Sequence, residues 1–487
     1  MLNYVSTRGE APKVTASQAI LNGIAPDGGL YVPEVWPALT LDWEKLKSQT
    51  YQEIATQIFD GFFDDFSVAE IDHIITKAYG NQWAQRDVVT YHQEDQLTYM
   101  ELFNGPTLAF KDVALQALPH LMTAAAKKQQ ITDTMVILTA TSGDTGTAAM
   151  RGFGDVPQTE IVVFYPEVGV SEMQRQQMQT EAAKNAHVIA ITGNFDDAQK
   201  AVKSLLSEKD LVADLAAHHQ RFSSANSINI GRLVPQIVYY IHAYAQLVNQ
   251  GQVQAGEPVT IVVPTGNFGN VLAAYYASQI GLPVRQFGVA SNENHVLTDF
   301  FQTGRYDRQR AFKVTNAPAM DILVSSNLER LLYFASGRNT AEVKRYMQDL
   351  ADKGAYEVTS ETRRQLSQFT AGFATQEQVT KTIQAVFDQT QYTIDPHTAV
   401  GRFVLSEQAI SGPTLLAATA SPYKFADTVL TALGAQAETG YQGLAQLAQL
   451  TQTTIPTAVD TLFAQPILHR QVITPAQIEK TFRQELL

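Results

Sequence analysis

The chain has no cysteine among its 487 residues. This absence excludes disulfide bonds, thiolate metal sites and cysteine nucleophiles, and it says nothing about the redox compartment. No apolar run is long enough to cross a bilayer, and residues 1–10 lack the basic region and apolar core of a signal peptide. We therefore expect a soluble, cytoplasmic protein.

Positive charge is scarce as well. The chain has 35 Lys and Arg against 48 Asp and Glu, a formal net charge of −13, and no basic cluster runs against this balance. Such a field repels nucleic acid and anionic membranes, so we expect neither as a partner. Charged residues make up only 17% of the chain and hydrophobic residues 45%. Length and composition together predict a large buried core divided among about three domains.

The middle of the chain alternates short apolar runs with helical stretches. The runs are rich in Val, Ile, Leu or Phe and bounded by turn residues, which is typical of strands buried on both faces of a parallel sheet. We predict strands over residues 135–140, 161–165, 187–192, 259–263, 284–290 and 414–419, and helices over 172–185, 196–208, 231–249 and 270–280. The alternation favours a wound α/β fold with ligands at the carboxyl ends of its strands.

The two ends of the chain have a different pattern. The first part has helical stretches over 43–59 and 68–79 and a Gly-rich hinge at Asp27-Gly28-Gly29. We predict an N-terminal lobe over 1–95, an α/β core over 96–425 and a helical C-terminal region over 426–487. Within the core we expect a smaller subdomain over about 125–220 and a helical insertion over about 320–390.

Lys111 is the first candidate for chemistry. It follows an apolar stretch with a Gly105-Pro106 turn and precedes a helix-like run over 113–122. Burial favours the neutral amine, which is the form that attacks carbonyls. The context therefore suggests a lysine that forms a Schiff base. The alternative is a solvated lysine at the start of a helix.

Two Gly-rich turns follow predicted strands and suit anions. The first is Pro264-Thr265-Gly266-Asn267-Phe268-Gly269-Asn270. A strand, a Gly-rich turn and a helix present backbone amides to a phosphate, although this turn is neither a Walker loop nor a dinucleotide fingerprint. The alternative is an ordinary turn with Asn270 as the helix N-cap.

The second turn is Thr141-Ser142-Gly143-Asp144-Thr145-Gly146-Thr147. Its hydroxyls and small residues predict a site for a substrate carboxylate, while the alternative is that Asp144 and Thr145 cap the next helix. One lysine and two anion-binding turns suit a cofactor that carries both an aldehyde and a phosphate.

Taken together, these motifs resemble the threonine synthases, which are pyridoxal-phosphate enzymes of fold type II. Residues 106–112, 142–146, 264–270 and 418–425 occur in that family's order, and residues 226–232 and 395–399 also match. Residues 4–8 and 25–33 resemble the extra N-terminal lobe of the longer form. The resemblance implies a tryptophan-synthase-β-like fold with two wound α/β subdomains.

The resemblance also implies roles for individual residues. Lys111 would hold pyridoxal phosphate and then act as the acid and base. The turn at 266–270 would bind the cofactor phosphate, and Ser142 to Thr145 would bind the substrate carboxylate. Thr419 would set its hydroxyl against the pyridine nitrogen; without the resemblance we would interpret it as a capping residue at a strand end. No metal is expected.

The implied substrate is O-phospho-L-homoserine, converted to L-threonine and phosphate. Our first candidate for the substrate phosphate is Arg232, with Ser227 and Asn229 beside it. A surface arginine at a helix start is the alternative, but a cation there is unfavourable without a bound anion. Weaker candidates are Gln174 and Arg175. We interpret His397 as packed or hydrogen-bonded, and Ser421, where many relatives carry histidine, as a cap.

Two other functions stay open from the sequence. One is a threonine or serine dehydratase-like enzyme, which would share the lysine and the phosphate turn. The other is a non-catalytic protein that binds pyridoxal phosphate. In every case we expect a small-molecule ligand and a monomer or homodimer.

Overall fold

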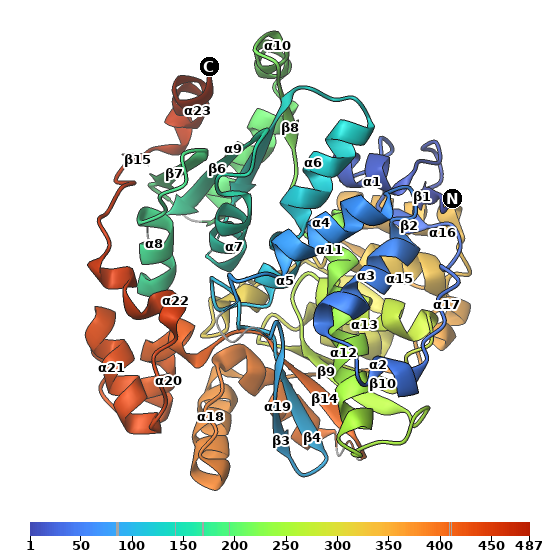
Figure 1. Cartoon of the computed structure of the whole chain (residues 1–487), viewed down its shortest axis with the longest axis vertical. Coiled ribbons are helices and arrows are strands. Elements are labelled where there is room, and N and C mark those ends of the chain that lie inside the picture. Colours follow the sequence, from blue (N-terminus) through green and yellow to red (C-terminus); the bar gives the residue numbers. More distant parts are fainter. Residues whose placement is uncertain (84–86, 142, 168–169, 194, 409, 411) are drawn as a thin grey trace.

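Two largely parallel sheets, each covered by helices, form the centre of the molecule (Figure 1). The computed structural model describes residues 1–83, 87–141, 143–167, 170–193, 195–408, 410 and 412–487. In Figure 1 the smaller sheet lies in the upper half and the larger sheet in the lower half. The wound α/β fold predicted from the alternation of strands and helices is confirmed.

The larger sheet has the strand order β13-β10-β9-β14-β4-β3. All neighbours are parallel except the antiparallel pair β3 and β4. Every residue of β9 and β14 is buried, which explains why these strands are continuous apolar runs. The strands are β3 (Thr90–Glu94), β4 (Leu97–Glu101), β9 (Val259–Pro264), β10 (Val284–Ser291), β13 (Phe369–Phe373) and β14 (Thr414–Ala418).

The smaller sheet has the order β15-β7-β6-β5-β8 and is parallel throughout. Its strands are β5 (Thr134–Ala140), β6 (Thr159–Pro166), β7 (Ala186–Ile191), β8 (Gln220–Ser223) and β15 (Val472–Ile473). The six strands that the sequence predicted are all present, three in each sheet. Since both sheets are wound, the turns after their strands gather at the carboxyl edges.

The N-terminal lobe packs against helices of the core. It consists of β1 (Tyr4–Ser6), α1 (Ala16–Asn22), β2 (Tyr31–Pro33), α2 (Trp43–Leu46), α3 (Tyr51–Phe62) and α4 (Val68–Ala78). Helices α1 and α4 contact α6 (Leu118–Lys128), and α3 contacts α12 (Pro235–Asn249). The predicted boundary at residue 95 falls in the turn between β3 and β4, so β3 belongs to the larger sheet and not to the lobe. The other domain boundaries stay predictions.

Two regions predicted as helical also contain strands. Residues 320–390 include β12 (Ala355–Glu357) and β13, and β13 forms the edge of the larger sheet. Phe369 of β13 stacks on Phe287 of β10 with ring centroids 4.8 Å apart. The C-terminal region likewise contributes β15 to the smaller sheet. Both strands are short, and tertiary pairing rather than local pattern decides their conformation.

Two helices are interrupted where one was predicted. Residues 231–249 divide into α11 (Ile230–Leu233) and α12, which has Pro235 in its first turn. The run at 113–122 divides into α5 (Lys111–Leu115) and α6, which has Pro119 in its first turn. Proline lacks the amide that would continue the preceding helix, so each break is placed by the sequence.

The remaining helices cover the sheets or form the surface. They are α7 (Asp144–Phe153), α8 (Glu172–Gln179), α9 (Phe195–Ser207), α10 (Lys209–Ala217), α13 (Gly269–Gln279), α14 (Val296–Thr303), α15 (Leu328–Ala335), α16 (Thr340–Lys353), α17 (Ser360–Gln365), α18 (Gln376–Thr390), α19 (Pro396–Glu407), α20 (Ala426–Ala432), α21 (Gly440–Thr451), α22 (Thr457–Asp460) and α23 (Ile478–Leu486). Four 3-10 turns, η1 (Pro318–Met320), η2 (Pro422–Phe425), η3 (Leu462–Ala464) and η4 (Pro475–Gln477), and the strand β11 (Arg305–Asp307), which pairs with β12, complete the fold.

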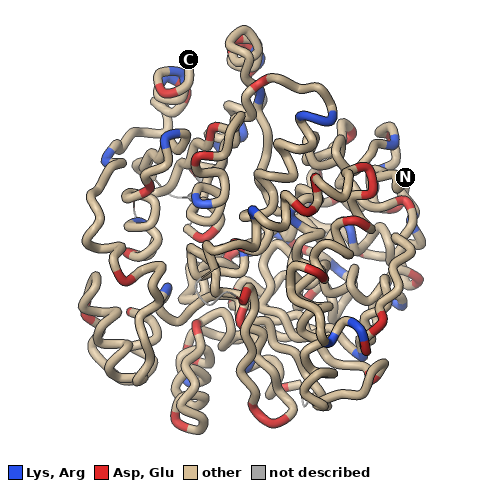
Figure 2. Tube along the Cα trace, in the orientation of Figure 1, with Lys and Arg blue, Asp and Glu red and all other residues tan. Residues whose placement is uncertain are grey.

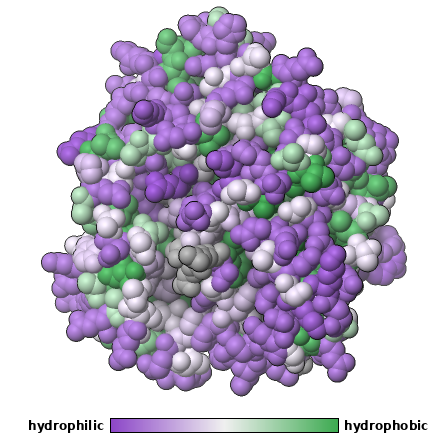
Figure 3. Space-filling view, viewed as in Figure 1, coloured by the Kyte–Doolittle hydropathy of each residue, from purple (hydrophilic) through white to green (hydrophobic). Residues whose placement is uncertain are grey.

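Charge is spread along the chain. Figure 2 shows Lys and Arg interspersed with Asp and Glu over the trace, and Figure 3 shows a mostly hydrophilic face with small separate hydrophobic groups. Within the described ranges, no helix combines the length and the apolarity needed to span a membrane.

Helices α5 and α7, which begin at Lys111 and Asp144, pack closely at Gly152. A methyl group on Gly152 would lie 2.1 Å from the carbonyl oxygen of Leu115 in α5. That oxygen belongs to the backbone and cannot move aside as a side chain can.

We predict that Gly152→Ala lowers the free energy of unfolding by about 1–3 kcal/mol, because the two helices must separate. Urea unfolding measures the change. Gly61→Ala is the matched control: it is also helical, but its methyl would meet only the movable end of the Leu39 side chain. We expect it to change stability by about 1 kcal/mol or less. Equal stability of Gly152→Ala and the parent chain would contradict the close contact.

Candidate active site

Lys111 begins α5 at the carboxyl edge of the larger sheet, and its side chain is 13% exposed. Two backbone hydrogen bonds tie the preceding segment to the segment after β14. The amide of Phe110 donates to the carbonyl of Thr419 at 2.9 Å, and the amide of Ser421 donates to the carbonyl of Leu108 at 3.1 Å. The predicted burial of Lys111 is confirmed, and the alternative of a solvated lysine is wrong.

Charged groups from three elements surround the Lys111 amine. Burial lowers its pKa below the ordinary value; Arg232 and Lys424 lower it further, while Asp144 opposes them. Asp144 Oδ2 lies 3.6 Å from Lys111 Nζ. A lowered pKa increases the fraction of neutral amine near neutral pH, which a nucleophilic or proton-transferring lysine requires.

Asp144, the first residue of α7, makes its strongest contacts with two other side chains. Its Oδ1 lies 3.0 Å from Lys424 Nζ and accepts a 2.8 Å hydrogen bond from Gln174 Nε2. Burial alone would raise the pKa of this carboxyl, but Lys424 and Lys111 outweigh it and hold the pKa well below its usual range. A fixed carboxylate repels a substrate carboxylate, so in the predicted carboxylate site only the backbone amide of Asp144, and not its side chain, suits the ligand.

Part of the turn before α7 is occupied by its own side chain. Thr141 Oγ1 accepts hydrogen bonds of 2.9 Å from the amides of Gly143 and Gly146. The Gly143 amide is therefore not free for a ligand. Gly143 has φ 140°, and a Cβ there would lie 2.2 Å from the Gln174 side chain. The amides of Asp144 and Thr145 donate to no acceptor in the described part of the chain. Ser142 lies outside the described residues.

The turn after β9 forms a cradle of backbone donors. The amides of residues 266–269 donate to no acceptor within the described ranges. Phe268, with φ 63°, and not Asn270, is the N-cap residue of α13. A Cβ on Gly266 would lie 3.0 Å from the carbonyl oxygen of Ala319. Free amides at the start of an eleven-residue helix suit an anion.

Two polar side chains at this edge have unused donors. Asn270 is 6% exposed; its Oδ1 accepts from the Tyr240 hydroxyl, while its buried Nδ2 has no partner among the described residues. Thr419 is also 6% exposed, and its hydroxyl makes no hydrogen bond within that part of the chain. Since β9 and β14 are parallel neighbours, Thr419 and the cradle follow strands that end at one edge.

The cradle is held from behind by α15 and the loop before it. Ser325 Oγ donates to the Gly266 carbonyl at 2.8 Å, and Asn327 Nδ2 donates to the Asn267 carbonyl at 3.0 Å. The fully buried Arg330 then bonds to Asn327 and, at 3.0 Å, to the carbonyl of Tyr31 in the N-terminal lobe. This network links the lobe to the anion cradle.

Arg232 on α11 is a buried cation without a counter-charge. It is 4% exposed; Nη1 donates to the Ala225 carbonyl at 2.9 Å, and Nε has no partner. No carboxylate lies within 4.0 Å of it among the described residues. Burial lowers its pKa to about 10. Because an unpaired buried charge is costly, this guanidinium indicates an anion site, and the surface alternative is wrong.

The neighbours of Arg232 behave differently. Ser227 is partly exposed, and its hydroxyl makes no hydrogen bond within the described ranges. Asn229 is fully buried and caps α11; its Nδ2 bonds to the carbonyls of Ile20 and Ser224 at 2.9 and 3.2 Å. Its amide is therefore used by the protein, and its predicted role as a substrate ligand is wrong.

The minor candidates are also placed by the structure. His397 is 2% exposed, with Nδ1 2.6 Å from Asp395 and Nε2 accepting from the Ala319 amide, so it is packed and hydrogen-bonded as expected. Ser421 caps η2, as expected. Arg175 is exposed. Gln174 is buried, and it contacts Asp144 instead of lying free for a ligand.

Sequence comparison assigns this site to a family. A family model described as "Threonine synthase N terminus" matches residues 3–79, and one described as "Pyridoxal-phosphate dependent enzyme" matches residues 93–363. The threonine synthase of Pseudomonas aeruginosa is 38% identical over 441 residues, covering 88% of this chain and 90% of that protein. The chain belongs to the threonine synthase family.

Other relatives agree at the level of sequence and structure. The crystal structure of the pyridoxal-phosphate-bound threonine synthase from Brucella melitensis superposes with a TM-score of 0.89 at 35% identity, covering 99% of each chain. Human threonine synthase-like 1 is 37% identical over 452 residues, covering 88% of this chain. The chain spans only about 60% of the length of that relative.

Lys424, which is buried beside Asp144, was not identified from the sequence. Its side chain is 0% exposed, and Nζ donates to the Thr107 carbonyl at 2.7 Å. A lysine between Tyr423 and Phe425 has the same apolar context that identified Lys111. That context was the available signal.

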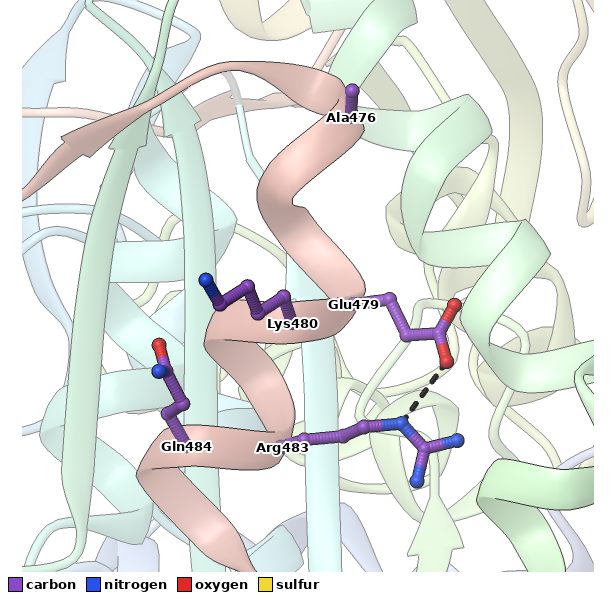
Figure 4. A pocket seen from close by; sticks show the side chains of 5 residues that line it. All are labelled: Ala476, Glu479, Lys480, Arg483 and Gln484. Carbon is purple, nitrogen blue, oxygen red and sulfur yellow. Dashed lines mark hydrogen bonds and ion pairs between the residues drawn. The ribbon is translucent and has the colours of Figure 1, made fainter.

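A surface hollow elsewhere does not compete with this site. It lies along η4 and α23 and is lined by Ala476, Glu479, Lys480, Arg483 and Gln484 (Figure 4). Arg483 is paired with Glu479 at 3.0 Å and with Asp214. Glu479 and Lys480 are exposed and Arg483 is paired with carboxylates, which is typical of a solvated helix face.

Asp112, the residue after Lys111, makes the stability of the folded chain depend on pH. It is fully buried and accepts hydrogen bonds from the amide and hydroxyl of Thr107 at 2.8 and 2.7 Å. Burial raises its pKa to about 6, from an ordinary value of 3.8. The folded state therefore favours the protonated carboxyl, and this contribution to stability is lost as the pH rises through about 6.

We predict that Asp112→Asn becomes more stable relative to the parent chain, by roughly 2–3 kcal/mol, between pH 4 and pH 7. Urea unfolding at several pH values measures the difference. Asp307→Asn is the control, because hydrogen bonding at the surface lowers the pKa of Asp307. Its difference should have the opposite sign and be small. A flat difference for Asp112→Asn would contradict the raised pKa.

Proposed function

We propose that this chain is a threonine synthase. It is a carbon–oxygen lyase that converts O-phospho-L-homoserine and water to L-threonine and phosphate, with pyridoxal phosphate as cofactor. One arrangement carries the proposal: a buried amine, Lys111, follows β4 at the same edge of the larger sheet as the cradle of free amides at residues 266–269, and an unpaired buried guanidinium, Arg232, acts on that amine. Two anion sites around one amine fit a cofactor phosphate and a substrate phosphate.

The residues present fit the cofactor. The amides of residues 266–269 have no acceptor within the described ranges and would hold its phosphate. Glycine at 266 suits this turn because a side chain there would press against the Ala319 carbonyl. The unpartnered Nδ2 of Asn270 would donate to the ring substituents. The free hydroxyl of Thr419 would meet the pyridine nitrogen and, unlike a carboxylate, would leave that nitrogen largely unprotonated.

Lys111 is the residue placed for proton transfer. When bound, pyridoxal phosphate supplies an electron sink that stabilises negative charge developing on the substrate carbons. Lys111 would hold the cofactor until the substrate amine takes its place. Its flexible side chain then moves protons at Cα, Cβ and Cγ in turn, which needs reach first and a lowered pKa second.

The substrate would be held at both ends. The free amides of Asp144 and Thr145 lie at the start of α7 and suit the α-carboxylate. Arg232, with the hydroxyl of Ser227, suits the phosphate, which the guanidinium can bind through two hydrogen bonds. Desolvation of Arg232 makes this interaction stronger than it would be at a surface.

The relatives support this proposal. Threonine synthases of Pseudomonas aeruginosa and Saccharomyces cerevisiae are 38% and 33% identical, and each comparison covers 88% of this chain. The yeast crystal structure superposes with a TM-score of 0.88. The cytoplasmic location and the monomeric or homodimeric state stay predictions from the sequence.

We expect Lys111→Ala to lower turnover of O-phospho-L-homoserine by about 10³-fold or more, because the proposed reaction uses this amine both to hold the cofactor and to transfer protons. The assay follows phosphate and threonine together, and circular dichroism checks the fold. Lys381→Ala is the control, since that lysine lies on the surface of α18, 71% exposed.

The same assay separates the alternatives. The formation of 2-oxobutanoate from threonine, without phosphate release from O-phospho-L-homoserine, would indicate a dehydratase. Substantial phosphate release by Lys111→Ala would remove Lys111 from the chemistry. A chain that binds the cofactor but turns over neither substrate would be a non-catalytic homologue.

We expect Arg232→Met to raise KM for O-phospho-L-homoserine by about 10- to 100-fold, because a charged hydrogen-bonded pair is lost. Cofactor affinity, measured by absorbance titration, should change little. Arg175→Met is the matched control on an exposed position. Equal weakening of substrate and cofactor would place Arg232 at the cofactor and not at the substrate.

A further inference from the structure

Asp144 lies between two lysines that belong to the other half of the molecule. Asp144 begins α7, which follows β5 of the smaller sheet, and Gln174 lies on α8, which follows β6 of the same sheet. Lys111 and Lys424 lie in segments that follow β4 and β14 of the larger sheet. Helix α7 contacts both α5 and α8, and α8 also contacts η2, which carries Lys424.

Lys424 is fixed in place and cannot serve a ligand directly. Its side chain is 0% exposed, and its Nζ is occupied by the Thr107 carbonyl at 2.7 Å and Asp144 Oδ1 at 3.0 Å. Thr107 is itself held by Asp112. The Lys424 ammonium therefore joins the loop that precedes Lys111 to the first residue of α7.

The two oxygens of Asp144 have different partners. Oδ1 lies 3.0 Å from Lys424 Nζ and accepts a hydrogen bond from Gln174, while Oδ2 lies 3.6 Å from Lys111 Nζ. A carboxylate held rigidly through one oxygen presents the other in a fixed direction. The separation from Lys111 is longer than a hydrogen bond, so the lysine keeps freedom to move.

We propose that Lys424 is a positioning residue for Lys111: together with Asp144, which it binds, it sets the charge of the Lys111 amine, Asp144 favouring the ammonium form and Lys424 opposing it. This inference rests on the proposed function, in which Lys111 holds the cofactor and transfers protons. In that reaction Lys111 must carry a proton at some steps and lack it at others. A fixed carboxylate stabilises the charged form, while Lys424 limits that stabilisation through its own charge.

The charges that face Lys111 come from every element packed around it. They are Asp144 of α7, Arg232 of α11 and Lys424 of η2; Asp112, the next residue on α5, is bonded to Thr107 instead. Removing Asp144 or Lys424 therefore removes charges of opposite sign. The two variants should shift the titration of Lys111 in opposite directions, which loss of structure alone would not do.

The test measures the Lys111 amine itself in the full chain without cofactor. Competitive acetylation with acetic anhydride over a pH series gives the midpoint at which Lys111 becomes reactive, read by mass spectrometry of its peptide. We expect Lys424→Met to raise this midpoint by about 1 pH unit and Asp144→Asn to lower it by about the same amount. Lys381→Met is the surface control and should leave the midpoint unchanged.

Two further variants keep the test decisive. Asp144→Asn with Lys424→Met removes the pair together, which a buried site tolerates better than a lone charge, and its midpoint should return close to that of the parent chain. Lys424→Arg keeps the positive charge, so its Lys111 midpoint should lie closer to that of the parent chain than the midpoint of Lys424→Met does. Midpoints that do not move, or that move in the same direction for both single variants, would overturn the proposal.

The outcome is separable from the proposed function. Opposite shifts in a chain that forms no threonine would retain the positioning role and reject the activity. A parent chain that forms threonine, with no shift in either variant, would reject the positioning role alone.

Discussion

The site depends on one buried carboxylate, Asp144, which two buried lysines share. Lys111 and Lys424 both face Asp144, while Arg232 close by has no carboxylate within the described ranges. Desolvating charges costs free energy that this one carboxylate offsets only in part. The folded chain therefore carries positive charge that a bound anion would neutralise, so an anionic ligand should stabilise the site as well as occupy it.

The architecture explains how so few elements assemble this chemistry. The neighbouring parallel strands β9 and β14 bring the amide cradle and Thr419 to one edge, and α7 reaches that edge from the other sheet. The N-terminal lobe is connected to the same site. Arg330 bonds to the Tyr31 carbonyl of the lobe and to Asn327, and Asn327 bonds to the Asn267 carbonyl of the cradle. The lobe thus supports the backbone of the anion site.

The sequence predicted those parts of the site that are determined by neighbouring residues in the chain. The apolar context of Lys111 and the Gly-rich turn after β9 identify a buried amine and an anion cradle, because burial and free amides follow from composition and chain direction. Local sequence could not indicate that the side chains of Asp144 and Asn229 are used by the protein itself, because their partners are a distant lysine and a distant carbonyl. The edge strand β13 was missed for the same reason: its pairing with β10 is decided by tertiary contacts.

Arg232 gives the strongest physical reason to prefer a phosphorylated substrate over threonine or serine. The cofactor phosphate can be neutralised by the amides of residues 266–269, which leaves the guanidinium still unpaired and buried. A substrate whose only anion is its carboxylate could meet the amides at the start of α7 and would leave Arg232 without a partner. In the proposed reaction a second phosphate would remove that cost, so binding free energy would favour a phosphorylated substrate.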